Sequence, residues 1–279
     1  MDEDLIAALR RIAEALERIA PPVDRPPSFE AGRMFRHDPR SDAFLAAPDF
    51  GLPLDLLVGV EPQKAKLMAN LQRFAGGLAS NHVLLWGVRG AGKSSLAKAA
   101  FMAVAAEHPA LKLVEVDRDE VAALPGVFER LRGASDRFVI LCDDLSFEEG
   151  AAAAKALKSA LEGGVAGPPR NTLFVATSNR RHLMPREHLE SRGAIAAAED
   201  AEEEVSVSDR FGLWIGFPPM DQDTYLAAVR AYAERFELGV PDLERRALRW
   251  SQLRGARSGR VAWQFTRDLA GELGKALPS

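Results

Sequence analysis

Cysteine is almost missing from this chain of 279 residues, in which Cys142 is the sole example. One thiol cannot form a disulfide within the chain, so we expect a reducing, cytoplasmic setting. The stretch from Met1 to Leu5 also lacks the basic and then apolar layout of a signal peptide. Because Cys142 lies in an apolar run, we expect it to fill space in the core rather than to act as a reactive thiol.

Three further features are scarce. No apolar run approaches the roughly 20 residues that span a bilayer, since Lys155 and Lys158 interrupt the longest candidate, and we expect no contact with a membrane. The five histidines show no pairing at ligand spacing, which argues against a metal site of His and Cys. A net charge of −4 provides no overall field that would attract nucleic acid.

The remaining composition, 47% hydrophobic and 27% charged, is that of an ordinary globular protein with one large domain or two modest ones. Residues 4 to 20 have an amphipathic helical pattern, and a proline-rich linker follows at residues 21 to 27. This helix packs either on a partner helix or on the chain's own body; the pattern leaves both open. We expect the segment up to Asp49 to be loosely structured, and take residues 1–50 as an N-terminal helix and linker.

Beyond residue 50, short aliphatic runs alternate with helical patterns. This alternation predicts an α/β fold with a mostly parallel sheet covered by helices on both faces, in residues 51–218. After Pro218 and Pro219 the pattern is helical, so residues 219–279 are predicted to form a small helical subdomain, with Asp221 or Asp223 as a helix cap and helices near 242–250 and 258–273. The predicted strands are Val83–Trp86, Leu111–Val116, Phe138–Cys142, Thr172–Ala176 and Leu213–Phe217.

A glycine-rich segment lies between the first of these strands and a helix predicted over Ser95–Ala106. Its order of strand, loop and helix is typical of a phosphate-binding loop, and predicts a nucleoside triphosphate with Mg²⁺ as the ligand. Lys93 is expected to reach the β- and γ-phosphates and the Ser94 hydroxyl to bind the metal, whereas Ser95 begins the helix. The predicted binding residues here are Gly87, Val88, Arg89, Gly90, Ala91, Gly92, Lys93, Ser94 and Ser95.

Polar side chains end two later strands. Asp143 and Asp144 follow an apolar strand, where Asp143 is expected to hold Mg²⁺ and Asp144 to orient or deprotonate the attacking water. Asn179 ends the next strand and is our candidate for a hydrogen bond to a water or a γ-phosphate oxygen. The alternative interpretations are ordinary ones: two acids that cap the next segment, and an asparagine in a turn.

Taken together, these features resemble the AAA+ ATPases, from about Leu57 to Leu273. Within that class the chain resembles a bacterial family of unknown function, domain of unknown function 815. Four strings carry this closer resemblance: Leu84 to Gly87, Cys142 to Phe147, Ala176 to Leu183 and Ser208 to Leu213. The resemblance implies ATP binding and hydrolysis, and no established substrate.

The resemblance also implies roles for residues outside the loop. Leu57, Val58 and Gly59 would lie near adenine, and Arg210 would be an arginine finger that completes the ATP site of a neighbouring subunit, which implies a homo-oligomer. Alternatively, Arg210 pairs internally with Asp209 or with the acids at 202–204. A sensor arginine at the start of a lid helix would be either Arg257 or Arg260.

Two departures from the AAA+ pattern bear on function. Asp144 stands where most members carry Glu, which indicates slow turnover. The segment Asp117 to Leu124 lacks the string with which protein unfoldases grip a threaded chain. We therefore expect an ATPase that drives conformational or assembly change on an unknown macromolecular client. The alternatives are a nucleotide-gated binding module that holds ATP without turnover, and a nucleic-acid remodeller of helicase-loader type suggested by arginines between 245 and 267.

Overall fold

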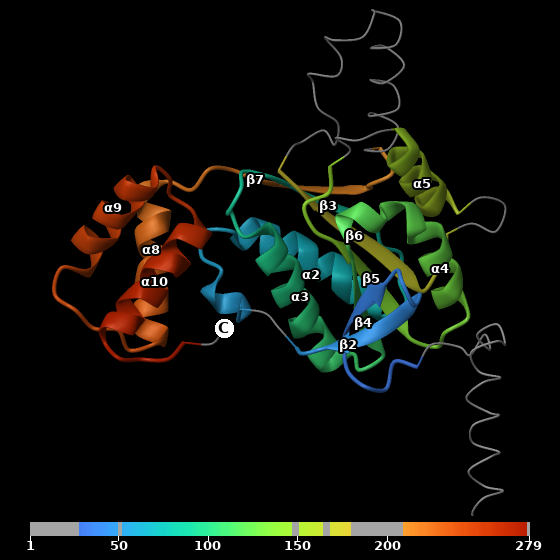
Figure 1. The fold of residues 1–279 in the computed structure, drawn as a ribbon, viewed down its shortest axis with the longest axis horizontal. Coiled ribbons are helices and arrows are strands. Elements are labelled where there is room, and N and C mark those ends of the chain that lie inside the picture. Colours follow the sequence, from blue (N-terminus) through green and yellow to red (C-terminus); the bar gives the residue numbers. More distant parts are fainter. Residues whose placement is uncertain (1–27, 50–51, 147–150, 164–167, 180–208, 278–279) are drawn as a thin grey trace, which may run out of the picture.

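The computed structural model describes residues 28–49, 52–146, 151–163, 168–179 and 209–277. Within these residues seven strands form one sheet in the order β2-β1-β4-β5-β6-β3-β7 (Figure 1). Every neighbouring pair is parallel except β1 and β2, which form an antiparallel hairpin at one edge. The strands are β1 (Met34–Asp38), β2 (Ala43–Ala47), β3 (Val83–Gly87), β4 (Leu111–Val116), β5 (Arg137–Cys142), β6 (Thr172–Ser178) and β7 (Leu213–Phe217).

Helices cover both faces of this sheet, as the alternation predicted. Helices α2 (Glu61–Ala75) and α3 (Lys93–Glu107) pack on one face, and α4 (Leu124–Arg132) and α5 (Ala151–Glu162) on the other. Strand β5 divides between them because side chains alternate along a strand: Phe138, Ile140 and Cys142 face α4 and α5, whereas Val139 and Leu141 face α2 and α3.

Cys142 is fully buried in this core, as expected of a space-filling residue. Burial raises the pKa of its thiol well above the ordinary range, which keeps the sulfur protonated and unreactive.

All five predicted strands are present, so the α/β fold class is confirmed. The expectation that residues up to Asp49 are loosely structured is wrong for β1 and β2, which extend the sheet beyond β4. The hairpin was missed because its strands are short and β1, with sequence MFRHD, carries three charged or titratable residues in five. Only its place beside β4 buries Met34 and Phe35.

Three C-terminal helices form a second cluster beside the sheet (Figure 1). These are α8 (Gln222–Arg235), α9 (Leu243–Arg254) and α10 (Gly259–Glu272), and they enclose a core of their own that includes Tyr225, Val229 and Phe265. We call this group of helices the lid. Its two predicted helices agree with α9 and α10 to within a few residues, and Asp221 caps α8 by accepting a hydrogen bond from Thr224 N at 2.8 Å.

Short 3₁₀ turns complete the described fold: η1 (Leu54–Leu56), which contributes Leu56 to the lid core, and η2 (Arg118–Ala123). Several predictions fall outside the described residues, namely the helix at 4–20, the linker at 21–27, the acids at 202–204 and the string from 180 to 183. In the part of the chain that is described, no helix combines the length and apolarity needed to cross a bilayer.

Candidate functional site

The glycine-rich loop connects β3 to α3, and its backbone conformation requires glycine at three positions. Gly87, Gly90 and Gly92 have φ angles of 135°, 79° and 93°, which side-chain-bearing residues rarely adopt. A Cβ atom on Gly87 would also lie 2.1 Å from the carbonyl oxygen of Phe217. Helix α3 begins at Lys93, two residues earlier than predicted, with Gly92 as its N-cap. The positive end of α3 therefore starts directly at the loop.

Lys93 is 6% exposed and is held by the loop itself. Its Nζ donates to the carbonyl oxygens of Gly87 and Val88 at 2.9 and 3.0 Å, and to Asn179 Oδ1 at 2.9 Å. Burial lowers the pKa of Lys93, and the nearby carboxylates of Asp144 and Asp143 act in the opposite direction. The ammonium group is therefore held beside the glycine-rich loop, in a position to bind an anion that contacts this loop.

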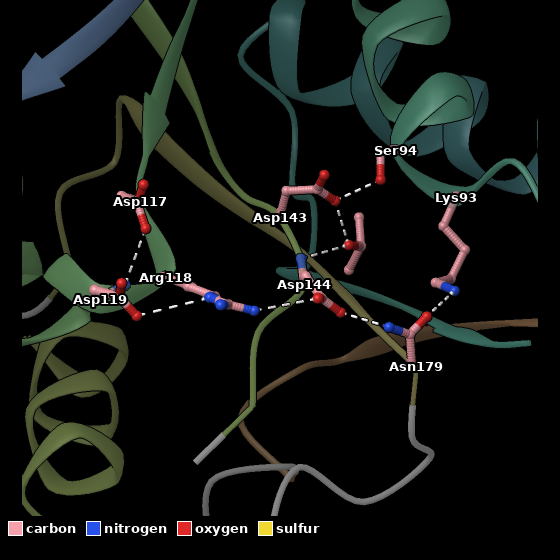
Figure 2. A network of polar contacts seen from close by, with 9 residues as sticks. Lys93, Ser94, Asp117, Arg118, Asp119, Asp143, Asp144 and Asn179 are labelled. Atoms are coloured by element: carbon pink, nitrogen blue, oxygen red, sulfur yellow. Dashed lines mark hydrogen bonds and ion pairs between the residues drawn. The ribbon is translucent and has the colours of Figure 1, made fainter. Parts of the chain in front are cut away.

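Asp143 lies at the end of β5, opposite the first turn of α3 (Figure 2). Its Oδ1 accepts hydrogen bonds from Ser94 Oγ and, at 2.5 Å, from Thr177 Oγ1. A carboxylate and hydroxyls gathered in this way form the hard oxygen donor set that suits Mg²⁺. Thr177 was not singled out from the sequence, and the signal was available, because it precedes Asn179 by two residues on the strand next to β5.

Asp144 has a left-handed backbone, with φ 55°, and its carboxylate is tied on two sides (Figure 2). Oδ1 accepts from Asn179 Nδ2 at 2.5 Å, and Oδ2 accepts from Arg118 Nη1 at 3.3 Å. Its backbone N–H donates to Thr177 Oγ1 at 2.9 Å. Asn179 thus bridges Lys93 and Asp144, and the sheet order β5-β6-β3 is what brings these three together.

A cavity of about 370 Å³ opens in front of these groups. We call the sheet, its covering helices and their loops the body. The body contributes residues of the glycine-rich loop, the carboxylates of Asp143 and Asp144, Thr177 and Asn179 to the cavity lining. The lid contributes Tyr232, Gly259, Arg260 and Trp263. Leu52, Tyr232 and Trp263 line the cavity without having been predicted as site residues. Among the predicted residues, the cavity is lined by Leu57, Arg89, Gly90, Gly92, Lys93, Ser94, Ser95, Asp143, Asp144, Asn179 and Arg260.

The other predicted residues lie elsewhere. Val58 packs against the lid core, and Gly59 has a φ of 79° and approaches Thr224 of α8. Arg257 lines a separate hollow with Val88 and Arg89. Gly87, Val88 and Ala91 belong to the loop without lining the main cavity. Of the two candidate sensors, only Arg260 therefore lies at the cavity.

Arg210 forms an ion pair with Glu162 of α5. The internal pairing expected for it as an alternative named Asp209 or the acids at 202–204, so Glu162 is a different partner from those expected. Both side chains of the pair are 41% exposed. An exposed ion pair of this kind contributes little to stability and is easily exchanged.

Within the described residues, two of the seven arginines between 245 and 267 have acidic partners. Arg245 and Arg246 pair with Asp242 and Glu272. The aromatic residues Trp250 and Phe265 pack edge to face with ring centroids 6.1 Å apart and belong to the core of the lid.

The family model described as "Protein of unknown function (DUF815)" matches residues 31–273 of the chain. Among solved structures, the chain is similar to Aeropyrum pernix Orc1 in complex with DNA, with TM-score 0.58, 15% identity, and coverage of 82% of this chain and 66% of Orc1. It is similar to a variant of Thermotoga maritima RuvB, with TM-score 0.53, 21% identity, and coverage of 80% and 67%. The Aeropyrum pernix ORC2 protein, in ADPNP and ADP complexes, gives TM-score 0.51, 17% identity, and coverage of 79% and 65%.

The chain thus spans about two thirds of the length of each of these three structures. At such identities the likeness shows the fold alone, which is the AAA+ fold of P-loop ATPases. No curated protein matches the sequence.

Proposed function

The chain belongs to the DUF815 family, and we propose that it binds ATP with Mg²⁺, hydrolyses it, and uses the cycle to change its own conformation or assembly on a macromolecular client. One observation carries this proposal. Lys93, Ser94, Asp143, Asp144 and Asn179 come from three strand ends and meet at one cavity beneath a glycine loop. Nothing in core packing requires a buried lysine, two carboxylates and an amide at one place.

In this proposal the loop amides and the start of α3 bind the phosphates, and Lys93 exchanges its carbonyl contacts for β- and γ-phosphate oxygens. Ser94 and Asp143 would hold Mg²⁺, which supplies positive charge to the phosphates when bound. Asp144 takes the proton of the attacking water, and Asn179 orients that water or a γ-phosphate oxygen. Leu57 lies at the cavity where the base would rest, with Val58 and Gly59 beside it.

We further propose that residues 219–279 act as a lid that senses the nucleotide through Arg260. Its backbone N–H already donates to Gly90 O at 3.2 Å, so α10 begins directly on the phosphate loop. A contact between Arg260 and the γ-phosphate would exist only in the ATP state, which is the difference that a switch requires.

A homo-oligomer would use Arg210 in trans. Its exposed ion pair with Glu162 could be exchanged for the γ-phosphate of a neighbouring subunit at small cost. The measurement is the mass in solution with and without a non-hydrolysable ATP analogue. We expect the wild type and Glu162→Gln to gain mass with the analogue and Arg210→Ala to gain less. If Arg210→Ala gained as much mass as the wild type, Arg210 would not act as an arginine finger.

A second candidate function, a module that holds ATP without turnover, is favoured by the state of Asp144. The carboxylate is one methylene shorter than glutamate and is engaged by both Arg118 and Asn179. A base occupied in this way has to leave Arg118 before it can accept a proton from water.

Steady-state phosphate release separates these two functions. The variants are Lys93→Ala and Lys98→Ala, the latter on the same helix but paired with Glu115 at 3.1 Å and outside the cavity. We expect the wild type and Lys98→Ala to release phosphate equally, and Lys93→Ala to be reduced to background. If the wild type released phosphate no faster than Lys93→Ala, hydrolysis would be contradicted and the module that holds ATP would be supported. If the wild type did not bind ATP, both proposed functions would be contradicted.

A further inference from the structure

Two residues of helix α10 line the cavity one turn apart. Arg260 and Trp263 are separated by three positions, so their side chains project from the same face of the helix. One carries a permanent positive charge and the other a large flat apolar ring. From this arrangement, and on the premise of the proposed ATP binding, we propose that Trp263 stacks on the base of the nucleotide and selects purine nucleotides, so that α10 reads both ends of the ligand.

The direction of α10 assigns the two ends. Its first residues rest on the phosphate loop, since Arg260 N donates to Gly90 O and a Cβ on Gly90 would come within 3.0 Å of Ser258 Oγ. Moving along the helix from Arg260 to Trp263 therefore leads away from the loop. The cavity is also lined by two apolar side chains of the body, Leu52 and Leu57, and by the aromatic ring of Tyr232 of the lid, which suit a base and not a phosphate.

The ring of Trp263 is held in place from behind. Tyr232 and Phe236, both of α8, contact it with centroid distances of 5.3 and 5.7 Å and interplanar angles of 72° and 59°. The indole is only half-buried, and the same side chain that packs on the lid core also lines the cavity. A ring already fixed by its neighbours loses little freedom when a base stacks on it.

Stacking explains selection by base size. A purine presents two fused rings to an indole where a pyrimidine presents one, so more apolar area is covered. Loss of the indole should then reduce the preference for ATP over CTP. It should leave the binding of a ligand without a base unchanged.

The experiment measures affinities by calorimetry, in Mg²⁺, for ATP, CTP and inorganic tripolyphosphate. We expect Trp263→Ala to lower the affinity for ATP about 10-fold and to bring the affinities for ATP and CTP closer together. Its affinity for tripolyphosphate should stay within about twofold of the wild-type value. Trp263→Phe, which keeps an aromatic face, should retain most of the ATP affinity. Arg260→Ala should weaken ATP and tripolyphosphate alike.

A matched control is Trp250→Ala, because Trp250 also belongs to the lid but packs on Phe265 and does not line the cavity. This variant should leave the ratio of ATP to tripolyphosphate affinity unchanged. Unchanged ATP affinity in Trp263→Ala would overturn the proposal, and so would an equal loss for ATP and tripolyphosphate, which would indicate a collapsed lid. If the wild type bound neither ligand, the proposed function itself would fail.

Tryptophan fluorescence is an independent readout. The chain has four tryptophans, and within the described residues Trp263 alone among them lines the cavity. ATP should quench the emission of the wild type, tripolyphosphate should not, and Trp263→Phe should lose the quenching. Quenching that persists in Trp263→Phe would contradict base stacking.

Discussion

The two sides of the cavity differ in how far their polar groups are already engaged. On the body side, Lys93, Asp143, Asp144 and Asn179 form a connected set of hydrogen bonds. On the lid side, the guanidinium of Arg260 makes no hydrogen bond or ion pair within the described residues, although it lines the same cavity. The polar groups of the body are therefore held in position by one another, whereas the guanidinium of the lid is not.

Burial explains this difference. An ammonium that is 6% exposed has to be hydrogen-bonded, because an unpaired buried charge is far too costly, and the strand ends supply the partners. Arg260 is exposed, so water satisfies its donors. We therefore expect a ligand to meet groups that are already fixed on the body side, and to form a new contact with Arg260 on the lid side. Four measurements test what we infer from this difference between the body and the lid.

The largest effect is expected at the body carboxylate that would act as base. Asp144→Asn keeps an oxygen to accept from Asn179 Nδ2 and tolerates the φ of 55°, yet cannot accept a proton. We expect kcat for phosphate release to fall by about 10²- to 10⁴-fold with ATP affinity unchanged. Asp119→Asn, a nearby exposed acid outside the cavity, is the control. A kcat that hardly changes would show that Asp144 is not the base.

The next effect concerns the stability of the body. Burial lowers the pKa of His82 to about 4, and its Nδ1 accepts from Phe174 N at 3.1 Å. The unfolded histidine takes up a proton below about pH 6.5 while the folded one does not. The free energy of unfolding should therefore be fully present above pH 6.5 and fall as the pH drops, by about 2 kcal/mol at pH 5.

Urea unfolding of the wild type and His82→Asn at pH 7.5 and pH 5 measures this contribution. The asparagine can accept the same hydrogen bond without titrating, so the loss on acidification should be smaller in the variant. The lid sequence, residues 219–279, contains no histidine, so the effect is confined to the body. Equal losses in both proteins would contradict a buried, neutral His82.

A smaller effect distinguishes the two lid arginines. Arg260→Ala should weaken ATP binding about 10-fold, which corresponds to one charge-assisted hydrogen bond to phosphate, whereas Arg257→Ala should stay within about twofold. The reason is that Arg260 lines the cavity and Arg257 lines a separate hollow. If Arg257→Ala lost more affinity for ATP than Arg260→Ala in a titration, Arg257 would be the sensor instead.

The smallest effect is expected at Arg118, which is 52% exposed and pairs with Asp144 on the solvent side. An exposed pair of this kind contributes at most about 1 kcal/mol, so Arg118→Ala should raise kcat by no more than about threefold through release of Asp144. Arg132→Ala, on the surface of α4, should leave kcat unchanged. A large rise of kcat in Arg118→Ala would mean that the ion pair with Asp144 suppresses phosphate release. A large fall of kcat would mean that Arg118 takes part in the reaction.

Local patterns were enough to predict much of this molecule. The runs of aliphatic residues identified the strands, because burial on both faces needs apolar side chains at every position, as in Phe138 to Cys142. Glycine spacing before Lys93 predicted a tight loop between β3 and α3, which the structure contains, because residues with a side chain rarely adopt those backbone angles. The hairpin β1–β2 was not predicted because both strands are short and β1 carries three charged or titratable residues in five.

Residue types and local patterns were enough to predict which groups the chain carries: a glycine-rich loop, two acids and an amide at strand ends, and arginines near a helix start. Which of these groups meet follows from the packing of the elements. Strand order placed Asn179 between Lys93 and Asp144, lid packing turned Trp263 and Arg260 toward the cavity, and a helix from elsewhere in the chain supplied Glu162 to Arg210. Local residue preferences act over a few positions, whereas such contacts join groups tens of residues apart whose positions follow from how the elements pack.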